Sequence, residues 1–326
     1  MRDVLGDVRV WLAAGDRVAL ATVVSTWGSA PRPAGSRMAI SASGKIAGSV
    51  SGGCLEGEVF EQAQSVLKGA APQLFHYGVS DDLAWTVGLS CGGEVDILVE
   101  PLTDIHRDLI AALEAERPVV LETATHDQVG ARRLLTGADP TVRDLLQRET
   151  PERRDGLFLE PFPRPSELLI FGGSHVAIPL TRLATVLGYR VTIVDARSKF
   201  ADAGRFPGAH KVIHAWPDEV LSGMPMDASS YVVILTHDPK FDDPTIRTAL
   251  AGHPRYIGAI GSRKTHRDRV ARLVAAGITP EELERVHAPI GLDLGAQTAE
   301  ETALAILSEM VAVRHGKAGG PMKSGA

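Results

Sequence analysis

Apolar and polar residues recur with two different periods along the first half of the chain. Apolar residues three and four positions apart predict helices over residues 1–14, 55–67 and 104–116. β-Branched and alternating stretches predict strands over residues 17–25, 94–100 and 118–125, and a hairpin that joins 38–40 to 45–50. This mixture of elements predicts an α+β domain.

The second half alternates strands with amphipathic helices. Residues 168–171 form a continuous apolar run, which is typical of a strand buried on both faces. Further strands are predicted over residues 189–194, 211–214, 231–235 and 255–260. The last helix begins at Thr298, where Glu301 completes a capping box. Alternation at this spacing predicts a Rossmann-like, doubly wound parallel sheet, so the expected fold class is α/β.

A charged and proline-bearing stretch over about residues 128–165 separates the two patterns. We therefore predict an α+β domain over residues 1–160 that ends in a linker, and a Rossmann-like domain over residues 161–326. The tail of the second domain, residues 315–326, is expected to be disordered. A length of 326 residues is consistent with two domains of ordinary size.

Composition narrows the class of protein. Hydrophobic residues make up 44% of the chain and charged residues 23%, which favours a packed core over disorder. The net charge of -6 argues against sequence-independent binding to nucleic acid, which relies on neutralising phosphates. No apolar run approaches the roughly 20 residues of a membrane span, and acidic residues near the N-terminus exclude a signal peptide. We therefore expect a cytoplasmic protein that binds neither nucleic acid nor membrane.

The chain has two cysteines, which excludes a disulfide framework and a zinc site of four thiolates. Each lies beside a glycine pair, in the stretches Gly52-Gly53-Cys54 and Cys91-Gly92-Gly93. Cys54 precedes a predicted helix, whose exposed N–H groups favour a thiolate. Two interpretations are open: the cysteines are small packing residues of the core, or they hold a soft metal together with a bound ligand.

The turn after the strand over residues 168–171 opens a helix and consists of Gly172, Gly173, Ser174 and His175. Asp195 ends the next strand about 20 residues later, where a dinucleotide-binding domain has the acid that accepts from a ribose hydroxyl. Ser174 replaces the glycine that lets a pyrophosphate approach. The turn therefore indicates either a site for NAD(P) or another nucleotide-like cofactor, or a Rossmann-like fold whose cleft has a different use.

Five further residues lie where a ligand is expected: Arg32, Arg37, His237, Ser262 and Arg263. The first two belong to a glycine- and proline-rich loop over residues 28–37, where they are either solvated or grip a phosphate. The other three follow predicted strands of the second domain. They therefore fall at the carboxyl edge of a parallel sheet, where ligands bind in such folds.

Several stretches in order along nearly the whole chain resemble one family, the xanthine dehydrogenase accessory proteins (XdhC/CoxI). They include GSAPRPAGSRM, GSVSGGCLEGE, GLSCGGEVDILVEP, FGGSHVA and YIGAIGSRKTH. The chain departs from the family at the Rossmann turn, where the family usually reads G-A-G-H and this chain reads G-G-S-H. That departure concerns nucleotide binding by the Rossmann domain and not its fold.

The resemblance implies a chaperone for the molybdenum cofactor, molybdopterin. Such proteins bind the cofactor, hold it while a cysteine desulfurase partner exchanges an oxo ligand for sulfur, and insert it into apo molybdenum hydroxylases of the xanthine or carbon monoxide dehydrogenase type. They are not known as turnover enzymes. By this likeness, Cys54 and Cys91 are expected to contact molybdenum or sulfur, and Arg32 and Arg37 to face the cofactor phosphate.

Two other functions are compatible with the residues. An NAD(P)-dependent oxidoreductase would bind its cofactor with the turn at residues 172–175 and with Asp195. Because Arg197 lies two residues after Asp195, the cofactor could be NADP as well as NAD. An interaction protein would bridge a desulfurase and an apoenzyme without holding a ligand. A homodimer is compatible with all three functions.

Overall fold

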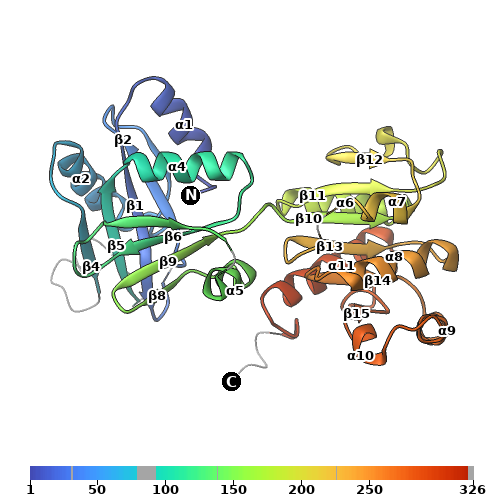
Figure 1. Cartoon of the computed structure of the whole chain (residues 1–326). Helices are drawn as coiled ribbons and strands as arrows, with labels where there is room; N and C mark the ends of the chain where they lie inside the picture. Colours follow the sequence, from blue (N-terminus) through green and yellow to red (C-terminus); the bar gives the residue numbers. More distant parts are fainter. Residues whose placement is uncertain (31, 79–92, 138, 225, 322–326) are drawn as a thin grey trace. The chain divides into compact units, whose positions relative to one another are not determined.

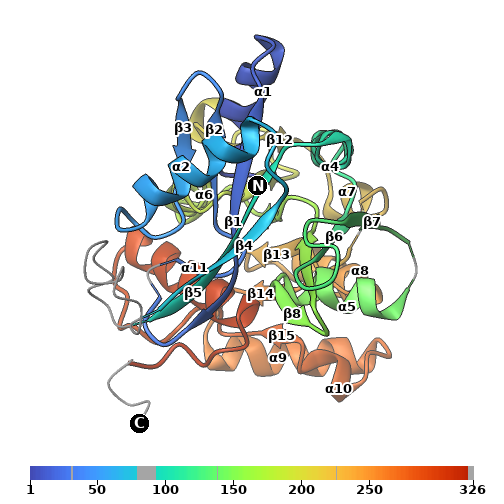
Figure 2. The same ribbon diagram turned by 90° about the vertical axis from the view of Figure 1, so that its left-hand side faces the viewer.

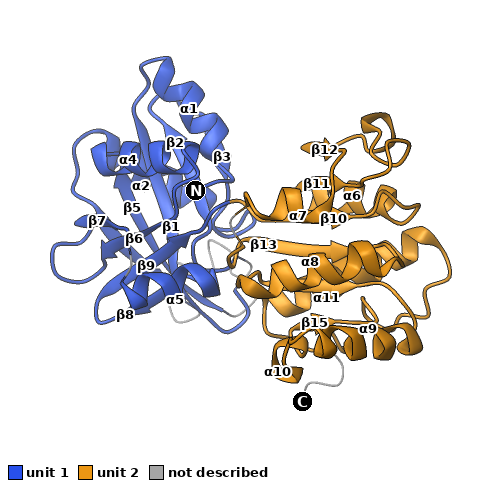
Figure 3. Cartoon of the chain, turned by 45° about the vertical axis from the view of Figure 1, so that its right-hand side comes forward, with its two compact units in different colours: residues 1–164 blue, residues 165–326 orange. Residues whose placement is uncertain are grey.

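The computed structural model describes residues 1–30, 32–78, 93–137, 139–224 and 226–321. The chain divides into two compact units, Met1–Arg164 and Pro165–Ala326, which are blue and orange in Figure 3. Each unit has sheets and cores of its own (Figures 1 and 2). The described helices include none that is long and apolar enough to cross a membrane.

Unit 1 contains a five-stranded antiparallel sheet around a long central strand. In spatial order its strands are β3 (Ile46–Gly48), β2 (Arg37–Ser41), β1 (Val18–Trp27), β5 (Glu94–Pro101) and β4 (Gln73–Tyr77). The apolar and β-branched sequence of β1 suits a strand whose two faces are both covered. One face packs under helix α2 (Glu56–Leu67), and the other packs against α1 (Leu5–Ala13), α4 (Asp104–Glu114) and the second sheet of the unit.

That second sheet has four antiparallel strands. They are β7 (Arg132–Leu135), β6 (Val119–Ala124), β9 (Leu157–Phe162) and β8 (Glu152–Arg154). Helix α5 (Pro140–Arg148) covers its outer face through Val142 and Leu145. Asp139 caps this helix by accepting from the Thr141 N–H at 2.7 Å, and Pro140 occupies its first position.

Unit 2 contains a six-stranded sheet in which every pairing is parallel. In spatial order its strands are β12 (Lys211–Ile213), β11 (Arg190–Val194), β10 (Glu167–Phe171), β13 (Ser230–Ile234), β14 (Tyr256–Ala259) and β15 (Val286–His287). Numbered along the chain, this order is 3-2-1-4-5-6, the arrangement of a Rossmann fold. The switch point of the strand order therefore lies between β10 and β13.

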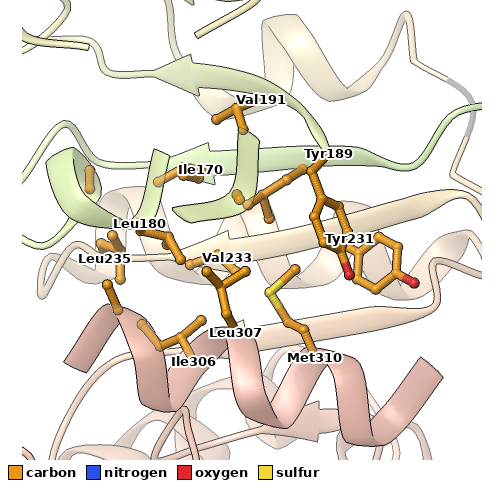
Figure 4. Close-up of a cluster of buried hydrophobic side chains, with 14 of the residues drawn as sticks. Ile170, Leu180, Tyr189, Val191, Tyr231, Val233, Leu235, Ile306, Leu307 and Met310 are labelled. Atoms are coloured by element: carbon orange, nitrogen blue, oxygen red, sulfur yellow. The ribbon is translucent and has the colours of Figure 1, made fainter. Parts of the chain in front are cut away.

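Helices cover both faces of this sheet. They are α6 (Ala177–Val186), α7 (Pro217–Leu221), α8 (Pro239–Ala251), α9 (Arg263–Ala275), α10 (Pro280–Leu283) and α11 (Ala299–Arg314), with a short 3-10 helix at Ala203–Arg205. Successive residues of β10 enter opposite cores, because side chains alternate along a strand. Figure 4 shows the core under α6 and α11, where Ile170 and Val233 face Ile306 and Met310.

The structure confirms the expected α/β fold class, with a Rossmann-like parallel sheet and an α+β unit before it. It also confirms the capping box at the last helix. The Glu301 carboxylate accepts a hydrogen bond from the Thr298 N–H, and the Thr298 hydroxyl accepts one from the Glu301 N–H. The charged stretch at residues 128–165 was expected to hold the domain boundary near residues 160–165, and the two units divide after Arg164. Most of the stretch is not a linker. This stretch instead supplies β7, α5, β8 and β9 of the first unit.

Candidate functional site

Cys54 lies in unit 1, in the turn that leads into α2. The carboxylate of Glu56, the first residue of α2, organises this turn. It accepts hydrogen bonds from the hydroxyl groups of Ser49 at 2.6 Å and Ser51 at 2.5 Å. Three backbone N–H groups also donate to it at 2.8–3.2 Å, those of Val50, Ser51 and Gly53. One side chain therefore holds the whole turn.

These contacts determine the charge of Glu56. Burial by itself raises the pKa of the carboxyl group, but the hydrogen bonds from Ser49, Ser51 and the backbone outweigh burial and lower the pKa to about 2. The ionised group lies at the N-terminal end of α2, where the helix dipole stabilises negative charge. The sequence predicts that exposed N–H groups at the start of this helix favour a Cys54 thiolate. The N–H groups of Val50, Ser51 and Gly53 donate to Glu56, but they precede Cys54, so the statement about the helix start stays a prediction.

The glycine pair before Cys54 is required by backbone conformation. Gly52 and Gly53 have φ angles of +77° and +124°, which favour glycine. A Cβ atom on either glycine would meet no atom of the described residues within 4 Å, so that part of the chain does not cover this side of the turn. The Cys54 side chain is half-buried and packs against the core under α2. The Cys54 thiol is therefore free and partly exposed within this turn.

The second predicted thiol cannot be placed in this site. Cys91 and Gly92 lie outside the described residues. Gly93 is described, and a Cβ on it would lie 2.8 Å from the carbonyl carbon of Ser29. Gly93 therefore allows the start of β5 to approach the loop at residues 28–37. In the described ranges, no three His, Cys, Asp or Glu side chains are grouped to hold a metal ion, and a metal site formed by both cysteines stays a prediction.

The expectation that Arg37 faces an anionic ligand is corrected by the structure. Arg37 is a residue of β2 whose side chain is only 3% exposed. Its guanidinium forms a bidentate ion pair with Glu160 of β9, so both charges are satisfied inside the unit. Arg32 is different, because its side chain is 40% exposed and lies 4.0 Å from Asp3, at the limit of an ion pair. Of the two arginines, only Arg32 is placed to meet a ligand.

In unit 2, the carboxyl edge of the parallel sheet holds a pocket of about 560 Å³. It lies at the switch point of the strand order, where ligands bind in doubly wound folds. The segments after β10 and β13 bring three of the residues singled out in the sequence to its wall, Ser174, His175 and His237. Arg197 and Phe200, which follow β11, line it as well.

Asp195 is not free to accept from a ribose. Its carboxylate accepts from Nε and Nη2 of Arg197, at 2.9 and 2.8 Å, and from the backbone N–H groups of Arg197 and Gly173, both at 2.9 Å. These hydrogen bonds hold the pKa of Asp195 below its ordinary value although burial acts to raise it. The role of ribose acceptor predicted for Asp195 is therefore corrected, since both of its oxygens are already engaged.

Gly173 also has a role that differs from the expected one. A Cβ on Gly173 would lie 2.3 Å from the carbonyl oxygen of Phe200, so the chain's own backbone occupies the space that glycine leaves. Arg205 reinforces this contact by donating to the Gly173 carbonyl at 2.8 Å. In dinucleotide-binding folds, the glycine that admits a pyrophosphate stands at the position that Ser174 takes in this chain, one residue after Gly173. The contact at Gly173 is therefore packing of the unit's own backbone on this turn.

Of the remaining candidates, Gly172 and Ser262 have structural roles, and Arg263 lies on the surface. Gly172 has a φ of +105°, and a Cβ on it would press against Thr236. Ser262 caps α9, because its hydroxyl accepts from the Thr265 N–H at 3.1 Å. Arg263 is the first residue of α9 and is exposed. Neither Ser262 nor Arg263 lines the pocket at the sheet edge.

Sequence reasoning missed several residues that shape the two sites. Glu56 was not singled out, although a carboxylate at a helix start next to two serines and a glycine pair is a recognisable signal. Phe200 and Phe241 line the pocket of unit 2 but lie in segments without a motif. Their contribution becomes visible only when β11 and β13 are placed on either side of β10.

Comparison with known proteins gives matches in both halves. A model of the XdhC Rossmann domain matches residues 168–310, and a model of the XdhC and CoxI family matches residues 11–78. A Bacillus subtilis protein described as a probable xanthine dehydrogenase component is 26% identical over 316 residues, which covers 92% of this chain and 94% of that protein. The molybdenum cofactor insertion chaperone PaoD of Escherichia coli is 29% identical over 311 residues, with 93% and 85% covered.

A solved Bacillus halodurans chain described as a xanthine dehydrogenase has the same fold. It superposes with a TM-score of 0.74 at 24% identity, covering 98% of both chains. The two family matches follow each other along one polypeptide, and the relatives extend over nearly all of it. The chain therefore belongs to the XdhC and CoxI family.

Proposed function

We propose that this protein binds molybdenum cofactor as a transient cargo and inserts it into a molybdenum hydroxylase of the xanthine dehydrogenase type. The observation that carries the proposal is the similarity over 93% of the chain to PaoD, a molybdenum cofactor insertion chaperone. The geometry of unit 1 supports it, because Cys54 is a free, half-buried thiol that directly follows two glycines with no described neighbour on their open side. Thiolate sulfur is a suitable ligand for a soft metal centre.

The finer steps of this proposal concern partners. A cargo held through Cys54 leaves its molybdenum accessible to a second protein, because the glycine side of the turn is open. We infer that a cysteine desulfurase is the partner that contacts the bound cofactor before its transfer to the apoenzyme. Arg32 is the arginine of its loop that is exposed enough to meet the anionic phosphate of the cargo. The resemblance to the family motifs, and not a described contact, adds Cys91 to this site.

The geometry does not favour an NAD(P)-dependent oxidoreductase. A dinucleotide needs the acid after the second strand for its ribose and the glycine-rich turn for its pyrophosphate. In this chain Arg197 pairs with that acid, and Ser174 stands where the pyrophosphate glycine is expected. Binding of NAD(P) would require the ion pair to open and the pyrophosphate to pass the Ser174 side chain.

The proposal predicts that Cys54→Ser lowers cofactor retention several-fold. The serine keeps the size of the side chain but removes the soft sulfur ligand. The measurement is oxidative release and fluorescence detection of pterin from the protein purified from a host that makes the cofactor. Ser65→Ala, an exposed change on α2, the helix that follows Cys54, is the control and should retain as much pterin as the parent.

Two outcomes would count against this proposal. If the parent protein carries no pterin, the binding function itself is wrong and a bridging role between partners gains support. If Cys54→Ser and a double variant that also carries Cys91→Ser retain as much pterin as the parent, the thiols do not hold the cargo.

A further inference from the structure

The pocket of unit 2 contains a rigid planar cation. The guanidinium of Arg197 lies 3.9 Å above the ring centre of Phe200 and is fixed from the side by two hydrogen bonds to Asp195. Its side chain is nevertheless 49% exposed, and it lines the pocket. A guanidinium held flat in this way is a stacking surface for the face of a planar ring.

The charges around the pocket do not suit a polyphosphate. The positive charge of Arg197 is balanced by Asp195, and Asp238 also acts on it electrostatically from the start of α8. Asp238 is held in place by accepting from the Lys240 N–H at 3.0 Å. The site therefore has no surplus of positive charge, and a diphosphate would meet two carboxylates.

The other groups on the wall are apolar or carry uncharged hydrogen-bonding atoms. Phe241 lines the pocket and is held by a parallel stack on Trp216, with ring centres 4.6 Å apart. The hydroxyl of Ser174 is buried and has no hydrogen-bond partner within the described residues. His175 and His237 each offer ring nitrogens that donate or accept. Apolar walls with a few polar groups are typical of small-molecule sites.

We propose that this pocket binds an uncharged, planar, pyrimidine-fused heterocycle. The face of the ring stacks on Arg197, and the edge of the ring forms hydrogen bonds with Ser174, His175 and His237. A pterin and a purine share this chemistry. If the ligand is the pterin of the cargo, the inference rests on the proposed function. If the ligand is a free purine, the inference is independent of that function. In either case the Rossmann unit serves as a ring site and not as a dinucleotide site.

Titration calorimetry on the full-length protein tests this inference with four probes: pterin, xanthine, inorganic phosphate and NADH. We expect at least one of the two heterocycles to bind and neither phosphate nor NADH to do so. Arg197→Lys keeps a positive charge beside Asp195 but removes the planar stacking surface, and it should weaken heterocycle binding about tenfold. Arg182→Lys, an exposed change on α6 outside the pocket, should leave the affinity unchanged.

The arms of the experiment separate the possible ligands. Binding of pterin alone identifies a site for the cargo ring, and binding of xanthine alone identifies a free purine. The inference is overturned if neither heterocycle binds, if NADH binds as tightly, or if Arg197→Lys behaves like Arg182→Lys. Pterin release from purified protein is an independent readout. A protein that carries cofactor but fails these titrations would keep the proposed function and lose the ring site.

Discussion

Glu160→Gln is expected to lower the free energy of unfolding by about 3–5 kcal/mol, the usual cost of removing one partner from a buried ion pair. Arg37 and Glu160 are 3% and 5% exposed and join β2 of one sheet to β9 of the other. Glutamine keeps the shape of the side chain but leaves the Arg37 charge without compensation. Denaturant unfolding monitored by circular dichroism measures the decrease in the free energy of unfolding of unit 1.

The chain offers a matched control for this variant. Glu122 and Arg133 form a bidentate pair across β6 and β7 of the same sheet, but the Arg133 side chain is 68% exposed. Solvent screens such a pair, so Glu122→Gln should cost far less. Replacing both Arg37 and Glu160 by methionine should recover most of the stability, because no charge is then left unpaired. Equal losses in Glu160→Gln and Glu122→Gln would show that burial of the pair does not matter.

The parallel sheet could be predicted because its residues carry a direct physical signal. The run at residues 168–171 is apolar at every position, and such a run is stable only when both of its faces are covered. Strand-to-helix alternation then leaves few possible topologies, since parallel crossovers are right-handed. The same reasoning placed Ser174 and His237 at one edge of the sheet.

Of the four strands in the second sheet of unit 1, β6 was predicted, and the other three escaped prediction for a reason visible in their residues. β9 carries Glu160 inside an apolar stretch, and β7 begins with Arg132, whose side chain is only 3% exposed. Read alone, each charge indicates a surface position. The charges are buried because Arg37 pairs with Glu160 and Arg132 pairs with Glu100, and a contact between distant strands has no local pattern. The same stretch contains Asp139-Pro140, a residue pair typical of a helix start, and α5 begins there.

The candidate sites show the same limit. The sequence pointed to Cys54 with its glycine pair and to Asp195 at the end of a strand. It did not reveal which neighbours engage the hydrogen-bonding groups there. Glu56 accepts hydrogen bonds from N–H groups of the turn before Cys54, and Arg197 forms an ion pair with Asp195. At both places the sequence indicates which residue type is present. Whether that residue can contact a ligand depends on a neighbouring side chain, which only the fold identifies.

Glu56→Gln is expected to destabilise unit 1 by about 2 kcal/mol and to lower pterin retention. A pKa lowered from 4.5 to about 2 corresponds to about 3 kcal/mol, and screening of a partly exposed group reduces that figure. Glutamine has one acceptor oxygen in place of two and turns an N–H group toward donors of the turn. The turn should then loosen around Cys54. Denaturant unfolding and pterin release measure the two effects, with Glu61→Gln on the exposed side of α2 as control.

The pH dependence of this variant distinguishes loss of charge from loss of shape. Because folding lowers the pKa of Glu56, its contribution is complete above the unfolded value of 4.5 and disappears as the pH falls toward 2. The difference in unfolding free energy between the parent and Glu56→Gln should therefore be constant near neutral pH and shrink below pH 4.5. General acid destabilisation cancels, since both proteins share it. A difference that stays constant down to pH 3 would mean that side-chain shape, and not the carboxylate charge, holds the turn at Cys54.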